Sequence, residues 1–313
     1  MVIVNDNMRN GKSYNGNTLK FGITVENIDY IVKLPKEALS VYTEYLASKF
    51  IRILGVSCHM VALGEYNNML VNVIKDFTSN SNLTLHSYKD TKQSSEDTDI
   101  SVKHYTYKDI TYLIEKHLKM TPEDKSVALN QFWNMFICDA ILANRDRHWG
   151  NWGYLSNGRS YKIAPIYDNG ASLFPNVDRV IKSYVSVEHR EEFLRERVFK
   201  FPASLFMIER PDRCYRTNYY EMFSDLRINH IFAKRVKYFR EHVSNAQVFK
   251  YAYNMCFNDK DLVDLDFAYK RFYVQIITLR YMCIINREDF HKSYMLVESW
   301  LESTFNRIQK LGH

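Results

Sequence analysis

Apolar positions follow strand-like spacing in the first part of the chain and helical spacing in the remainder. Short runs rich in β-branched and aromatic residues, bounded by turn residues or proline, predict strands. These runs lie at residues 19–25, 30–34, 58–63 and 69–74. Helical spacing predicts one helix among them, from Ser40 to Leu54, which Gly55 ends. The first part is therefore a small β-rich region with a single helix.

A polar stretch separates this region from the helical remainder. Residues 78–98 are rich in Ser, Thr, Asn, Asp and Lys, which predicts a mobile surface insertion. Beyond it, helices are predicted near 102–119, 126–143, 229–257, 265–286 and 288–310, with short strands at 152–155 and 161–164. We predict an α+β chain with an N-terminal lobe at 1–77, a flexible polar insertion at 78–100 and a helical C-terminal lobe at 101–313.

Composition and charge narrow the classes of function. Charged residues make up 25% of the chain and the net charge is +6, but the basic residues form no block, so we expect no direct nucleic-acid binding. The five cysteines lack zinc-site spacing. The apolar stretch Phe272–Ile285 contains Arg280 and is too short to cross a bilayer. The polar start is no signal peptide. We expect a cytoplasmic protein without a membrane span, and secretion into a host without a signal peptide stays open.

Three polar residues in loops carry the strongest chemical signal. Asp146 is followed five residues later by Asn151, and Asp168 comes after the predicted strand at 161–164. Phosphoryl transfer from ATP needs a carboxylate that accepts the proton of the acceptor hydroxyl. It also needs an Asn and a second carboxylate that hold magnesium, and Asp-x4-Asn is the spacing of a kinase catalytic loop. Taken singly, Asp146 and Asn151 are also ordinary turn residues.

The surrounding sequence resembles two groups of kinases. The segments NRDRHWGNWGYL and KIAPIYDNGAS contain these three residues. Phosphoinositide lipid kinases have a related loop, but Asn144, Asp146, His148 and Asn151 match the N-x-D-x-H-x-x-N loop of HipA-like bacterial Ser/Thr kinases. Residues 164–168 match the APxYD metal segment of that family. The resemblance implies a two-lobed protein-kinase-like fold that uses ATP and Mg²⁺, with a small β-rich N-lobe and a larger, mainly helical C-lobe.

The resemblance also implies contacts to the nucleotide from the first part of the chain. Lys33 resembles the strand lysine that contacts the ATP phosphates, and Glu44 would pair with it from the following helix. A solvated Lys33 and a surface Glu44 are the alternatives. The phosphate-covering loop corresponds to residues 11–18, where Ser13 is a candidate for autophosphorylation, and the hinge corresponds to residues 73–77. The implied set of nucleotide-contacting residues is Gly11, Ser13, Gly16, Asn17, Lys33, Glu44, Lys75 and Phe77.

Other residues of the catalytic loop keep two interpretations each. His148 either takes part in catalysis with Asp146 or holds the loop backbone through hydrogen bonds. Arg145 and Arg147 either stabilise phosphate charge or pair with acidic neighbours. We expect the large rings that flank Asn151 to pack the loop against the core.

One departure from the family pattern affects the expected partners. HipA itself has an extra N-terminal subdomain before its phosphate loop, whereas here that loop begins about a dozen residues from Met1. We therefore expect a stand-alone kinase and a monomer, acting on a protein Ser/Thr hydroxyl, and contacts to an antitoxin or DNA are in doubt. A kinase of a small-molecule or lipid hydroxyl is one alternative. A nucleotide-binding interaction protein without catalysis is another.

Overall fold

The computed structural model describes residues 1–14, 18–37, 39–94, 106–179, 181–209 and 213–311. Its α+β fold agrees with the class predicted from the sequence. The chain divides into two compact units. The first unit comprises residues 1–139, 143–178 and 203–217, and the second comprises 140–142, 179–202 and 218–313. The lobe boundaries predicted from the sequence divide the chain differently and stay a prediction.

A five-stranded sheet in the order β1-β4-β5-β3-β2 forms the start of the first unit. Its strands are β1 (Val2–Ile3), β2 (Lys20–Val25), β3 (Ile28–Lys33), β4 (Val61–Tyr66) and β5 (Met69–Lys75). All pairs are antiparallel except β1 with β4. Two-residue turns close the β2–β3 and β4–β5 hairpins, and all four turn residues have positive φ. Asn tolerates that conformation, and it occupies three of these four positions, at residues 27, 67 and 68.

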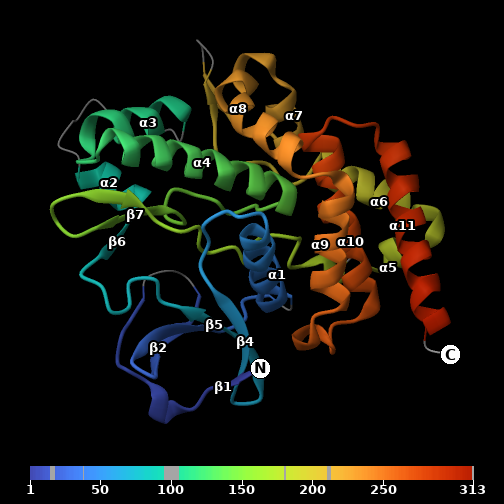
Figure 1. The fold of residues 1–313 in the computed structure, drawn as a ribbon, viewed down its shortest axis with the longest axis horizontal. Helices are drawn as coiled ribbons and strands as arrows, with labels where there is room; N and C mark the ends of the chain where they lie inside the picture. The colour runs from blue at the N-terminus through green and yellow to red at the C-terminus, as the bar shows by residue number, and fades with distance from the viewer. Residues whose placement is uncertain (15–17, 38, 95–105, 180, 210–212, 312–313) are drawn as a thin grey trace. The chain divides into compact units, whose positions relative to one another are not determined.

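Helix α1 (Ser40–Ile53) packs against β4 and β5 of this sheet, as Figure 1 shows. Leu46, Phe50 and Ile51 are fully buried on the helix. Asn72 on β5 is also buried, and its Nδ2 donates to the carbonyl oxygen of Val41 at 2.9 Å. Because Val41 lies in the first turn of α1, this hydrogen bond fixes the start of the helix to the sheet.

A three-stranded sheet in the order β6-β7-β8 belongs to the same unit. Its strands are β6 (Thr84–Ser87), β7 (Gly153–Ser156) and β8 (Tyr161–Ile163). The other elements of this unit are α2 (Tyr88–Ser94), α3 (Tyr107–Tyr112), α4 (Pro122–Leu142, whose last three residues belong to the second unit), β9 (Ile208–Glu209) and β10 (Cys214–Tyr215).

The structure differs from the predicted surface insertion over residues 84–94, which form β6 and α2. Tyr88 explains the difference, because it is fully buried and its ring stacks on Trp152 with centroids 4.7 Å apart. One buried ring and a long-range strand pairing give a mainly polar segment a fixed place. Residues 95–100 of the predicted insertion lie outside the described residues.

Helices form the second unit: α5 (Ile181–Val185), α6 (Val187–Phe199), α7 (Tyr219–Ser224), α8 (Leu226–His242), α9 (Asn245–Phe257), α10 (Phe267–Arg280) and α11 (Phe290–Leu311). In Figure 1, α9, α10 and α11 run side by side. The single helix expected at 229–257 is two helices, because Ser244 and Gln247 form a capping box that starts α9. Among the helices that the structure describes, none is both long and apolar enough to cross a membrane.

Candidate active site

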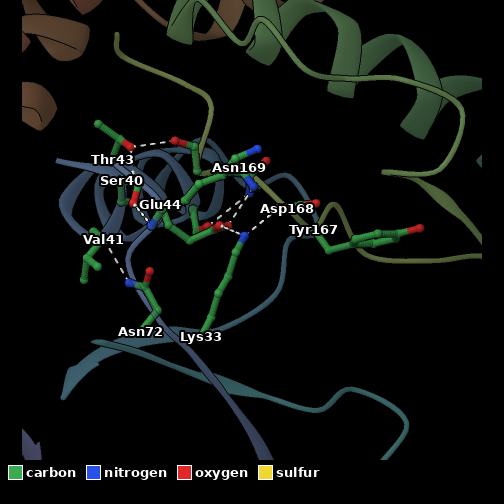
Figure 2. Close-up of polar contacts among 12 residues, drawn as sticks. Lys33, Ser40, Val41, Thr43, Glu44, Asn72, Tyr167, Asp168 and Asn169 are labelled. Carbon is green, nitrogen blue, oxygen red and sulfur yellow. Dashed lines mark hydrogen bonds and ion pairs between the residues drawn. The ribbon is translucent and has the colours of Figure 1, made fainter. Parts of the chain in front are cut away.

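Lys33, Glu44 and Asp168 meet in one cluster, although they come from three separate segments of the first unit (Figure 2). Lys33 Nζ lies 2.6 Å from Glu44 Oε2 and 2.5 Å from Asp168 Oδ1. Glu44 is 0% exposed, so the interpretation of Glu44 as a surface residue is excluded. The lysine at the end of β3 is also mostly buried and paired, which excludes a freely solvated Lys33.

Several hydrogen bonds fix the carboxylate of Glu44. Its Oε1 accepts from the backbone N of Asn169 at 2.6 Å and lies 3.2 Å from Nε2 of the buried His59. The Oγ of Thr43 donates to the carbonyl oxygen of Gly170 at 2.8 Å, so α1 is tied to the segment that carries Asp168. Figure 2 labels Thr43, Glu44 and Asn169 and shows that Thr43 and Glu44 point toward the segment that carries Asp168. The sheet and the segment that carries Asp168 therefore hold α1 from two directions.

Charge pairing within the cluster overcomes the cost of burial. Burial disfavours the charged form of Glu44, but Lys33 and His59 outweigh it and hold the pKa of Glu44 well below its ordinary value. Burial also disfavours the Lys33 ammonium, but Glu44 and Asp168 raise the pKa of Lys33 above its ordinary value. Lys33 is therefore a fixed cation at neutral pH.

The loop with Asp146 and Asn151 is closed by its own hydrogen bonds. It begins where α4 ends at Ala143, whose φ of 55° turns the chain away from the helix. Asn144 Oδ1 accepts from the backbone N of Asp146 at 2.9 Å. Asn151 Nδ2 donates to the carbonyl oxygen of Asp146 at 2.8 Å, so the two residues of the Asp-x4-Asn motif are in direct contact. The side chain of Asp146 is 50% exposed and so accessible to an acceptor molecule.

Arg147 is buried and joins the loop to the segment around Asp168. Its guanidinium donates to both carboxylate oxygens of Asp139 on α4, at 2.9 and 3.1 Å. It also donates to the carbonyl oxygens of Asn151 and Tyr167, and at 2.6 Å to Oδ1 of Asn169. Burial raises the pKa of Asp139, although Arg147 acts in the opposite direction. Of the two interpretations of Arg147, pairing with an acidic neighbour is the one the structure supports.

Arg145 and His148 occupy the solvent side of the loop. The guanidinium of Arg145 pairs with Glu37, so it too contacts an acidic neighbour. His148 Nδ1 accepts from the backbone N of Gly150 at 2.9 Å, which supports its role in holding the loop. In the neutral ring this hydrogen bond assigns the proton to Nε2, which lies 4.0 Å from Asp146 Oδ1. The catalytic role of His148 stays a prediction.

Asn151 and Asp168 provide a donor set that suits magnesium. Because Nδ2 of Asn151 is held by Asp146, its Oδ1 is the atom that remains for a cation. Asp168 is partly exposed and adds carboxylate oxygens. Magnesium accepts one or two protein carboxylate or amide oxygens and keeps several waters, so this small set fits it. Within the described ranges there is no cluster of three or more His, Cys, Asp or Glu side chains of the kind that forms an all-protein metal cage.

Comparison with known proteins identifies the family. The family model described as HipA-like C-terminal domain matches residues 12–197. The chain belongs to this family. It is 33% identical over 218 residues to the serine/threonine-protein kinase CtkA of Helicobacter pylori. That alignment covers 66% of this chain and 64% of the relative, so it spans less than two thirds of the relative's length.

Solved structures agree with the family assignment. The crystal structure of the Helicobacter pylori proinflammatory kinase CtkA matches with a TM-score of 0.71 and 26% identity, covering 90% of this chain and 94% of that chain. The HipA of Shewanella oneidensis MR-1, solved in a complex with HipB and its operator DNA, matches with a TM-score of 0.51 and 11% identity over 93% of this chain and 68% of that chain. The second match shows a similar fold alone.

The loop predicted to cover phosphates makes contacts at its start. Lys12 Nζ pairs with Asp29, and Tyr14 Oη donates to Asp76 Oδ2 at 3.0 Å. Gly11 has a φ of 74°, which favours glycine there, and Ser13 is exposed. The expected contact residues Gly16 and Asn17 lie outside the described residues.

At the predicted hinge, the structure places Lys75 at the end of β5, where its backbone N donates to the carbonyl oxygen of Met60 at 2.9 Å. The ring of Phe77 lies 6.1 Å from the ring of Tyr167, centroid to centroid, so the segment after β5 lies beside the metal segment. The contacts of Lys75 and Phe77 to a nucleotide stay a prediction.

Sequence reasoning missed five groups that support this site: the partly buried Cys58 and the buried Ser48, His59, Asp139 and Asn169. Asn169 Nδ2 donates to Ser48 Oγ at 3.0 Å and contacts Cys58 Sγ at 3.3 Å. Burial raises the pKa of the Cys58 thiol to about 12, so it is un-ionised at neutral pH. The detectable signal was an acidic residue, Asp139, within the apolar face of a helix, eight residues before Arg147.

Proposed function

We propose that this protein is a serine/threonine protein kinase that uses ATP and Mg²⁺. The observation that carries the proposal is the bridge from Lys33 Nζ to both Glu44 and Asp168, in the same compact unit as the Asp146–Asn151 loop. In kinases the pairing of a strand lysine with a helix glutamate and the placement of the metal-binding aspartate are both needed for activity. The contacts of Lys33 with Glu44 and with Asp168 support this proposal.

Each side chain has a role that its position supports. The exposed carboxylate of Asp146 would orient the acceptor hydroxyl and accept its proton as the hydroxyl oxygen attacks the γ-phosphorus and ADP leaves. Lys33, a fixed cation, would contact the nucleotide phosphates. Asn151 and Asp168 would hold Mg²⁺, which supplies neutralisation of phosphate charge when bound. His148 Nε2 would help orient the Asp146 carboxylate.

The substrate class comes from the family and the relative. A protein named as a serine/threonine-protein kinase is 33% identical over the aligned residues, so a Ser or Thr hydroxyl of a protein is the proposed acceptor. Autophosphorylation belongs to the same proposal, and the exposed Ser13 is its candidate site. Phosphopeptide mapping after incubation with ATP and Mg²⁺ tests that part. Labelled peptides elsewhere with an unmodified Ser13 would reject Ser13.

The decisive experiment is transfer of radiolabelled phosphate from ATP by wild type and by Asp146→Ala. We expect Asp146→Ala to lose about 10²- to 10⁴-fold in turnover, the contribution typical of a positioned base, with ATP affinity nearly unchanged. The exposed Asp178 in the same unit offers the control Asp178→Ala, which should keep its activity. Near wild-type turnover by Asp146→Ala would remove Asp146 from the mechanism.

The same assay separates the rival functions. Label transferred to a lipid or small-molecule hydroxyl, with none on protein, would favour a kinase of another substrate class. ATP binding without transfer to any acceptor would favour a non-catalytic nucleotide-binding protein.

A further inference from the structure

His59 is a buried residue that contacts both helix α1 and the segment that carries Asp168. It is 4% exposed and lies between α1 and β4 in the sequence. Its backbone N donates to the carbonyl oxygen of Ile166 at 2.9 Å, and the preceding Cys58 forms an isolated parallel bridge with Ile166. Since Ile166 stands two residues before Asp168, the backbone of His59 is fixed to the start of that segment.

The imidazole of His59 reaches two side chains of α1 through one nitrogen. Nε2 lies 2.9 Å from Ser48 Oγ and 3.2 Å from Glu44 Oε1. Glu44 and Ser48 are one helical turn apart, so they lie side by side on α1. Asn169 contacts the same two side chains, because its Nδ2 donates to Ser48 Oγ at 3.0 Å and its backbone N donates to Glu44 Oε1 at 2.6 Å. These four residues thus form a closed ring of polar contacts, in which no residue is more than 4% exposed.

The contact with Glu44 assigns a hydrogen to Nε2 of His59. Burial disfavours the charged form of Glu44, but Lys33 and His59 outweigh it, so the pKa of Glu44 stays well below its ordinary value. Glu44 is therefore a carboxylate at neutral pH, which accepts hydrogen bonds and donates none. A bare nitrogen lone pair at 3.2 Å from Glu44 Oε1 would be repelled, so Nε2 carries a hydrogen. The imidazolium and one neutral tautomer both have this hydrogen, and His59 donates to Glu44 in either form.

A serine, a histidine and a glutamate in contact also resemble the triad of a hydrolase, but the geometry excludes that function. In a triad one ring nitrogen of the histidine contacts the serine and the other contacts the acid. Here both contacts use Nε2 of His59. Ser48 is only 1% exposed, so a substrate cannot reach its hydroxyl. The ring of contacts therefore acts on Glu44 and not on a substrate of its own.

We propose that His59 is a positioning residue for phosphate transfer, which orients the Glu44 carboxylate so that Glu44 holds Lys33 toward the nucleotide phosphates. This proposal rests on the proposed function. Lys33 contacts Oε2 of Glu44, whereas His59 and the backbone N of Asn169 contact Oε1, so the donors on the two oxygens fix the plane of the carboxylate. Without the donor on His59 the carboxylate is free to turn, and Lys33 loses a fixed partner. Because kinases need the lysine–glutamate pair in place, turnover is the quantity that should fall.

Two substitutions test the donor atom itself in the radiolabel transfer assay. The side-chain amide of Gln places its NH₂ donor near the position of Nε2, whereas the shorter Asn places it near Nδ1. We expect His59→Asn to lower kcat about ten- to hundredfold, the loss typical of a hydrogen bond to a charged group, and His59→Gln to recover most of it. The KM for ATP should change much less than kcat, because Lys33 remains a cation. The exposed His242 provides the control variant His242→Asn, which should match wild type.

Two further measurements separate positioning from damage to the fold. Titration with ATP and Mg²⁺ counts the binding-competent molecules, so that kcat is expressed per folded site, and a purely structural role would leave this value unchanged in His59→Asn. Long-range ¹H–¹⁵N spectra of wild type report the hydrogen on the His59 ring without any loss of stability, with the signals assigned by their absence in His59→Gln. A neutral ring with its hydrogen on Nδ1, an unchanged kcat per site in His59→Asn, or a His59→Gln as slow as His59→Asn would each overturn the proposal.

Transfer by wild type in the same assay keeps the two proposals apart. If wild type transfers phosphate and His59→Asn matches it, the role of His59 fails and the kinase proposal stands. If wild type transfers none, the kinase proposal fails, and the positioning role fails with it.

Discussion

Replacing Arg147 with Met should be among the most destabilising changes in the loop that contains Asp146 and Asn151. The variant Arg147→Met keeps much of the side-chain volume but removes the hydrogen bonds to Asp139, Asn169 and two backbone carbonyls. Asp139 is fully enclosed on α4, so its carboxylate is left buried without its cation. Breaking a buried ion pair from one side costs about 3–5 kcal/mol.

Arg145 is a matched control from the same loop. Its pair with Glu37 is partly exposed, with 39% of the arginine side chain accessible. Surface ion pairs of this kind contribute about 0–1 kcal/mol, so Arg145→Met should stay close to wild type. Urea unfolding at neutral pH measures both variants. Domains typically have unfolding free energies of about 5–15 kcal/mol. The Arg147→Met variant should therefore stay folded at low temperature, so that its urea unfolding can be measured.

The loss of unfolding free energy in Arg147→Met should depend on pH. Without Arg147, burial is opposed only by the hydrogen bond from Asn144, so the folded-state pKa of Asp139 rises further above the ordinary value of 3.8. The folded variant then binds more protons than the unfolded chain, so its stability falls as pH rises from about 4 through the raised pKa. We expect a larger deficit at pH 8 than at pH 5. The double variant Asp139→Asn with Arg147→Met should recover part of the stability and lose this pH dependence.

Two results would refute this reasoning about the buried pair. One is a loss of unfolding free energy below about 1 kcal/mol in Arg147→Met, which would make the Asp139–Arg147 pair equivalent to an exposed ion pair. The other is a deficit that is the same at both pH values and is not reduced by Asp139→Asn, which would mean that the uncompensated carboxylate is not its source.

Three further predictions concern the site. Gly170→Ala places a Cβ 2.9 Å from Glu44 Oε2, so we expect about 1–3 kcal/mol of destabilisation in urea unfolding and at least tenfold lower turnover. Because the pKa of Glu44 is lowered, its ionic stabilisation is complete above its ordinary value of 4.5 and is lost as pH falls below it. The difference in unfolding free energy between wild type and Glu44→Gln should therefore shrink below pH 4.5. Chelation with EDTA should abolish phosphate transfer and leave the Tm of the free protein unchanged.

Local sequence signals were sufficient for β2, β3, β5 and α1, whereas β1 was not predicted and β4 runs from Val61 to Tyr66 instead of residues 58–63. The hairpin turns contain Asn at positions with positive φ, and the apolar positions of β2, β3 and β5 match their buried faces. The helix expected from Ser40 to Leu54 is found from Ser40 to Ile53. These elements were predictable because strand alternation, helical spacing and turn chemistry are properties of neighbouring residues.

Elements that depend on distant partners were not predictable in this way. β6 pairs with β7, so that Thr84 lies opposite Ser156 in the sheet. No sequence pattern near residue 84 indicates that pairing. Helix α6 carries mostly charged side chains and buries Phe193, Leu194 and Val198, which leaves too weak an apolar pattern to recognise. In both cases tertiary packing, and not local propensity, determines the secondary structure.

The residues of the site also divide into those that the sequence could predict and those that depend on distant contacts. Lys33, Glu44 and Asp168 could be named because the residues around them follow a family pattern, and the structure brings them together. Asn169 could not be named, because its role depends on a backbone bond to Glu44 and side-chain bonds to groups far away in the sequence. The three cluster residues are recognisable by motif, whereas the role of Asn169 is recognisable only from its contacts.

Asn169 also constrains how this protein can be regulated. Its backbone N holds Glu44, and its side chain contacts Arg147, Ser48 and Cys58, so α1 and the catalytic loop share one buried network. Moving α1 outward would break several buried hydrogen bonds at once, each costing about 1–3 kcal/mol when left unmade. The described start of the predicted phosphate loop, by contrast, exposes Ser13 and is held by the partly exposed pair of Lys12 with Asp29 and by the hydrogen bond from Tyr14 to Asp76. The described contacts at the start of the predicted phosphate loop are thus few and partly exposed, whereas several buried hydrogen bonds hold α1.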